Sequence, residues 1–109
     1  MTRNEYIKLA TEAKRSGIHD RWIPLRDGAG LAIVTSCKFC DIKDKLQMEC
    51  SIVCPFVTCH GWNLFRKWMN ALPNSKQERK AAQEIIDFLK AFDPGKWADH
   101  LIEIGVLQP

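Results

Sequence analysis

All five cysteines of this 109-residue chain fall between residues 37 and 59, in an order typical of a metal-binding segment. Cys37-x2-Cys40 is the spacing that lets two thiolates of one tight turn bind a single ion. Cys50-x3-Cys54 puts two more sulfurs one helical turn apart, on a shared face. Together the two pairs offer four soft ligands, a closed tetrahedral set for Zn²⁺. The spacing therefore predicts one structural zinc site.

The exact ligand set stays open, because a C-x4-C or C-x5-H step can return to the same ion and would bring in Cys59 or His60. One of the cysteines can also be a small buried hydrophobe. An iron–sulfur cluster is the alternative cofactor, since four cysteines and a Cys-Pro step suit one as well. The candidate metal ligands are Cys37, Cys40, Cys50, Cys54 and Cys59, with His60 as a further candidate.

Other chemistry explains these residues less completely. A redox dithiol would account for Cys37-x2-Cys40 but would leave the other three cysteines without a role. Catalytic zinc usually has mixed nitrogen and oxygen ligands and a nearby Glu base, yet the sequence has no H-x-E or H-E-x-x-H pattern. No other residues pair a nucleophile with a base. We therefore expect a protein that is not an enzyme.

The elements around the cysteines must position them. Thr2 and Glu5 form a capping box that begins a helix, and Gly17 is placed where a glycine ends one. Two β-favourable runs within residues 21–36 flank the turn at 27–30, which predicts a short β-hairpin. Pro24 would place its first strand at an edge.

Three more helices are expected after the cysteines. The first covers residues 61–72, with Trp62, Phe65, Trp68, Met69 and Leu72 along one side. The second begins at Ser75, which forms a capping box with Glu78. The third follows Asp93-Pro94 and ends near Gly105. The predicted fold is a single α+β domain over residues 1–109, with a hairpin, a cysteine-rich metal-binding loop region and about four helices.

Charge and hydropathy limit the partners and the compartment. Sixteen Lys and Arg against thirteen Asp and Glu give a net charge of +3, and no run of five like charges occurs. This balance permits an anionic partner without requiring one. The first residues lack the apolar core of a signal peptide, and no stretch is long and apolar enough to cross a membrane. We therefore expect a cytoplasmic protein with reduced thiols and no membrane partner.

The order of these features resembles that of small bacteriophage proteins carrying a C-x-x-C, then a C-x-x-C-P and a fifth cysteine before an aromatic residue. The matching positions here are Cys37, Cys40, Cys50, Cys54-Pro55 and Cys59, with Trp62 near the aromatic position. The resemblance covers roughly residues 20–62. This chain differs from the phage pattern in having three residues, not two, between Cys50 and Cys54. It implies a metal-binding phage accessory protein in the host cytoplasm.

Two functions follow as expectations. The favoured one is a non-enzymatic zinc-binding protein that binds a host protein or ribonucleoprotein and inhibits a bacterial defence nuclease, such as a CRISPR effector. Its contacts would come from exposed residues near the metal, such as Trp22, Arg26, Lys43 and Lys45. For Trp22 a second place stays open, as a cover over the metal region. The alternative is a small zinc-dependent regulator that binds nucleic acid. Its basic residues would be Lys38, Lys43 and Lys45 near the metal and Arg66, Lys67, Arg79 and Lys80 on helices, although Asp41, Asp44 and Glu49 lie among the first group.

Overall fold

The computed structural model describes residues 1–28, 37–58 and 61–109. Across these ranges every named element is a helix and no strand occurs. A single isolated bridge joins Thr2 to Gln108. The predicted α+β class is therefore wrong, and the described chain is all-helical.

The N-terminal helix is longer than the sequence indicated. It consists of α1 (Arg3–Ser16), the π-helix η1 (Gly17–Trp22) and α2 (Ile23–Arg26), which follow one another without a break. The Thr2 cap is confirmed, because its hydroxyl accepts a hydrogen bond from the Glu5 amide at 3.3 Å. The predicted stop at Gly17 is wrong. This glycine has right-handed helical angles, with φ −58° and ψ −46°, so the helix continues through it.

The first strand of the predicted hairpin is helical instead. Ile18, Trp22 and Leu25 are all buried, and their spacing of four and then three residues places them on one face of a helix. Pro24 lies in the first turn of α2, directly after the π-helix η1. The hairpin prediction is therefore wrong for this part, and its second strand lies at 29–36, outside the described residues.

The segment predicted as a metal-binding loop contains three short helices. They are α3 (Lys38–Leu46), α4 (Cys50–Val53) and α5 (Pro55–Thr58). Phe39 and Ile42 are buried on one face of α3, which explains why this stretch is helical. Gln47 ends α3 in the left-handed conformation at φ 53°.

The C-terminal helices agree with the prediction. They are α6 (Gly61–Asn70), α7 (Lys76–Ala91) and α8 (Pro94–Glu103). The Ser75 hydroxyl caps α7 and the Asp93 carboxylate caps α8, each by accepting backbone hydrogen bonds from the first turn. One detail is wrong: Met69 and Leu72 do not line a buried side, because they are 57% and 72% exposed.

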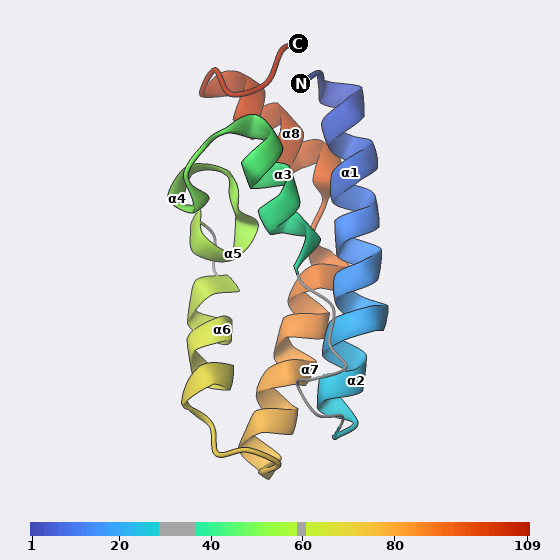
Figure 1. Ribbon diagram of the computed structural model, residues 1–109, viewed down its shortest axis with the longest axis vertical. Helices are drawn as coiled ribbons and strands as arrows, with labels where there is room; N and C mark the ends of the chain where they lie inside the picture. Colours follow the sequence, from blue (N-terminus) through green and yellow to red (C-terminus); the bar gives the residue numbers. More distant parts are fainter. Residues whose placement is uncertain (29–36, 59–60) are drawn as a thin grey trace.

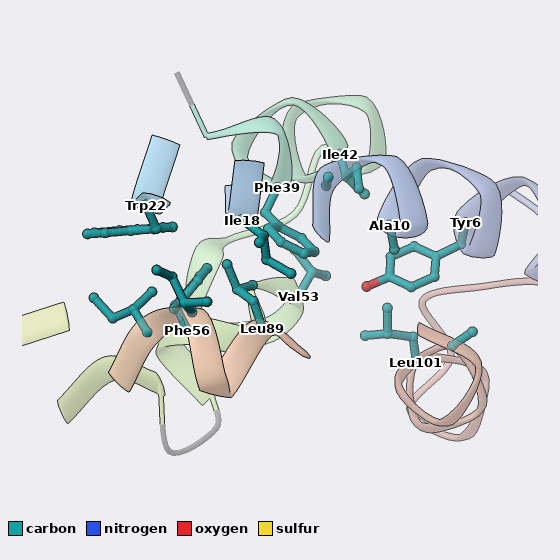
Figure 2. Close-up of a cluster of buried hydrophobic side chains, with 14 of the residues drawn as sticks. Tyr6, Ala10, Ile18, Trp22, Phe39, Ile42, Val53, Phe56, Leu89 and Leu101 are labelled. Carbon is teal, nitrogen blue, oxygen red and sulfur yellow. The ribbon is translucent and has the colours of Figure 1, made fainter. Parts of the chain in front are cut away.

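The helices pack into an elongated body of 44 × 22 × 22 Å (Figure 1). The run α1–η1–α2 lies along α8 and α7, α3 packs on α1, and α6 packs on α7. Figure 2 shows part of the core between them, which includes Ile18, Trp22, Phe39, Phe56 and Leu89. The cysteine-bearing helices pack on this core through Phe39, Ile42 and Val53.

Candidate metal centre

Four of the predicted ligands lie at the ends of two short helices. Cys37 is the N-cap of α3 and Cys40 follows in its first turn, where the Cys40 amide donates to the Cys37 carbonyl at 3.1 Å. Cys50 begins α4 and Cys54 is its C-cap, with the Cys54 amide donating to the Cys50 carbonyl at 2.9 Å. Each pair is therefore held by a single turn of backbone, as the spacing predicted.

The two pairs face one cavity, here called the thiol cavity, of about 200 Å³. Its lining combines the four cysteines with one cation and three aromatic rings, namely Cys37, Cys40, Cys50, Cys54, Arg21, Trp22, Phe56 and Phe65. No disulfide joins any two of these four cysteines. Residues from η1, α3, α4, α5 and α6 thus meet at a single point of the fold.

The thiols are gathered but not closed into a ligand shell. Within the part of the chain that the structure describes, no three His, Cys, Asp or Glu side chains lie close enough together to hold a metal ion. Cys59 and His60, the other two candidate ligands, lie outside the described residues. A zinc ion would need the thiols to draw in toward a common centre about 2.3 Å from each sulfur.

Aromatic contacts fix the helices that carry the cysteines. The Phe39 ring of α3 lies edge-on to Phe92, with ring centres 5.6 Å apart, and Phe56 of α5 lies 5.4 Å from Phe88 of α7. The Trp97 indole of α8 donates a hydrogen bond to the Val53 carbonyl at 3.1 Å, which attaches α4. The helices that carry the cysteines are therefore held against the end of α7 and against α8.

The electrostatics of the cavity are mixed. Partial burial, followed by the nearby Cys37 and Cys50 thiols, raises the pKa of the Cys40 thiol above its usual value. The positive charges of Lys43 and Arg21 act in the opposite direction. The pKa of Lys43 is itself raised, first by its hydrogen bond to Asp44 and to a smaller extent by Cys50 and Cys40. Lys43 and Arg21 thus offset only part of the rise in the pKa of the Cys40 thiol.

The sequence did not establish that Trp22 and Arg21 line this cavity. Trp22 was predicted either to cover the metal region or to be an exposed contact residue; it is only 2% exposed and lines the thiol cavity, so the exposed alternative is wrong. Arg21 was not identified at all. Its only signal in the sequence is its position next to Trp22, and its place at the cavity depends on η1 continuing the N-terminal helix.

No protein-family model, curated protein or solved structure matches this chain. In the described ranges, none of the helices combines the length and apolar character that a membrane crossing needs.

Proposed function

We propose that this chain is a non-enzymatic binding protein whose cysteine segment is held by a zinc ion, and that its partner is a host protein or ribonucleoprotein. The observation that carries the proposal is the meeting of Cys37, Cys40, Cys50 and Cys54 at one cavity. Four thiolates are the donor set of closed, structural zinc sites, which hold no reacting water. The zinc ion would supply folding free energy to α3 and α4.

The first test is metal content and its dependence on the thiols. The reduced protein is expected to bind about one zinc ion per chain, because one cavity gathers four ligands. Cys37→Ser or Cys54→Ser should lower zinc content and loosen α3–α5, since metal binding and local folding are coupled. Elemental analysis and hydrogen exchange of residues 37–58 measure both effects. Iron with visible colour, or a folded reduced chain that takes up no metal, would show the zinc assignment to be wrong.

Cys59→Ser is the matched control for these variants. It makes the same chemical change at the one cysteine outside the described residues. If the four described cysteines form the complete set, Cys59→Ser keeps wild-type zinc content. Loss of zinc in this variant, with retention in Cys50→Ser, would move Cys59 into the site in place of Cys50.

The surface for the partner is a separate question. A groove of about 740 Å³ runs between α6 and α7, and we call it the basic groove. Arg66 and Lys67 line it from α6 and Lys80 lines it from α7, while Glu84 contributes the one acidic side chain of its lining. Lys67 and Glu84 form an ion pair at 3.8 Å. The groove therefore presents an excess of positive charge toward whatever it binds.

This excess of charge favours the second candidate function, a regulator that binds nucleic acid. The groove brings together Arg66, Lys67 and Lys80, three of the four helix residues named for that function. Met69 and Leu72, the sequence neighbours of the lining residues Asn70 and Ala71, expose large apolar side chains, which suit a protein partner better than a phosphate backbone. We therefore keep the protein partner as the proposal and nucleic acid as the alternative.

Salt dependence separates the two functions. Binding driven by phosphates weakens steeply with salt because condensed counterions are released, whereas a largely apolar protein interface weakens only modestly. We expect at most weak, salt-sensitive binding of random single-stranded RNA or duplex DNA, measured by fluorescence anisotropy over a salt series. Submicromolar affinity at physiological salt, lost in Arg66→Gln/Lys67→Gln but kept in Lys8→Gln/Lys96→Gln, would establish the regulator instead.

The protein partner itself is sought by capture from host lysate, with and without nuclease treatment. A partner that stays bound after nuclease treatment, and that is lost when Met69 and Leu72 are both changed to Ser, supports the proposal. Capture that depends entirely on intact nucleic acid contradicts it. Inhibition of a defence nuclease is the activity to assay once such a partner is identified.

A further inference from the structure

The Arg21 guanidinium has a buried donor atom with no hydrogen-bond partner. Its Nε is inaccessible to solvent and donates to no acceptor within the described residues. Burying a charged donor without an acceptor is costly, and such groups are rare in native proteins. A feature of this kind calls for an acceptor that completes it.

The same side chain lines the thiol cavity. Arg21 belongs to η1, and its guanidinium carbon lies 5.1 Å from the centre of the Trp22 ring, another lining residue. This cation–π contact holds the planar group against the aromatic wall. The Trp22 indole N–H can only donate, and the other side chains of the lining are thiols and phenyl rings, so the cysteine sulfurs are the side-chain acceptors of this lining.

A zinc ion with four thiolates carries two negative charges in excess. In a partly buried site this excess is stabilised by hydrogen bonds and positive charge around the sulfurs, and removing such outer groups usually costs about 10- to 100-fold in metal affinity. On the basis of the proposed zinc site, we infer that Arg21 is the residue that donates a hydrogen bond from Nε to a metal-bound thiolate and offsets part of its charge. Arg21 is thus a positioning residue of the metal centre.

The test compares metal binding by three variants of the full-length chain. Arg21→Met keeps the length of the stem against Trp22 but removes the charge and the donors, and Arg21→Gln keeps an amide donor without charge. Arg21→Lys keeps the charge. Arg26→Met is the matched control, because the Arg26 guanidinium already pairs with Asp27 and Gln83 and does not line the thiol cavity. Zinc affinity is measured by competition with a chelator.

We expect Arg21→Met and Arg21→Gln to bind zinc about 10- to 100-fold more weakly than the wild type, with Arg21→Lys in between and Arg26→Met unchanged. The Co²⁺-substituted protein gives a second readout that a purely structural role would not alter. A donor to sulfur lowers the energy of its lone pairs, so Arg21→Met should move the thiolate-to-cobalt charge-transfer band to longer wavelength. Arg21→Lys should restore much of this shift.

Two results are distinguishable. If the wild type binds neither Zn²⁺ nor Co²⁺ through thiolates, the zinc site is wrong and the role of Arg21 falls with it. If the wild type binds both, while Arg21→Met or Arg21→Gln (whichever folds) keeps wild-type affinity and an unshifted band, the zinc site stands and the role of Arg21 is wrong.

Discussion

Glu12 forms a hydrogen bond between the long N-terminal helix and the first residue of α3, the helix that follows Cys37. Its carboxylate accepts hydrogen bonds from Arg15 within α1, at 2.6 and 3.0 Å, and from Lys38 at the start of α3, at 3.3 Å. These two cations lower the pKa of Glu12 to about 2, with Arg15 the larger influence. The side chain is solvent-exposed, so its effect on stability is reduced by water. Its partner Lys38, however, directly follows the candidate ligand Cys37 in the sequence.

A pH series on Glu12→Gln tests this contact. A carboxylate with a depressed pKa adds stability that is complete above its unfolded value, near 4.5, and is lost as the pH falls toward about 2. The variant should therefore have a lower free energy of unfolding than the wild type at pH 7. The difference between the two free energies should shrink as the pH falls from 4.5 to 2. Urea unfolding across this range measures it. Glu103→Gln is the control on an exposed residue of α8, and an equal pH-dependent loss there would refute the role of Glu12.

The cysteines of the candidate site could be predicted from the sequence, but the residues that surround them could not. Cysteine spacing was sufficient to group Cys37 with Cys40 and Cys50 with Cys54, because each pair is bridged by one backbone turn. Arg21 could not be found in this way. Arg21 lines the same cavity as the thiols because the fold brings η1 and the cysteine segment together, and no local pattern of residues encodes that arrangement.

Helices with local signals were predicted correctly, and those without were not. Ser75 and Asp93 predict the starts of α7 and α8, because each side chain accepts a hydrogen bond from a backbone amide two or three residues further on. In η1 and α2 the buried stripe of Ile18, Trp22 and Leu25 was present in the sequence, but it begins directly after Gly17, a residue type that often ends a helix. Tertiary packing overrides that local preference, because the neighbouring helix needs the space that a side chain at this position would fill.

Gly17 provides that space, and this gives an element-scale prediction. A β-carbon at this position would lie 3.1 Å from the Leu89 Cδ1 atom, and Leu89 is fully buried in α7. Alanine favours helix over glycine by about 1 kcal/mol, but overpacking a core costs about 1–3 kcal/mol. Gly17→Ala is therefore expected to lower the free energy of unfolding by about 1 kcal/mol.

The partner variant Leu89→Val shows whether contact is the cause. Valine has no Cδ atom, so the penalty of Gly17→Ala should largely disappear when both changes are combined. Denaturant unfolding of the two single variants and the double variant gives the coupling between the positions. An unchanged penalty in the double variant would place the cause in the π-helix itself rather than in the contact with α7.

At the scale of the whole molecule, α6 is shared by the two candidate sites. Phe65 lines the thiol cavity, whereas its neighbours Leu64 and Arg66 line the basic groove. The helix also packs on α7, which supplies the opposite wall of the groove. The position of α6 therefore sets the shape of both sites, and a metal that orders one would define the geometry of the other.

The two ends of the described chain meet. The Gln108 amide donates to the Met1 carbonyl at 3.2 Å, and Figure 1 shows both ends at the tip of the molecule opposite the turn from α6 to α7. A protein tethered by either end, to a surface or to another chain, would thus stand in nearly the same orientation. It would hold the α6–α7 end outward, free to meet an object as large as a ribonucleoprotein.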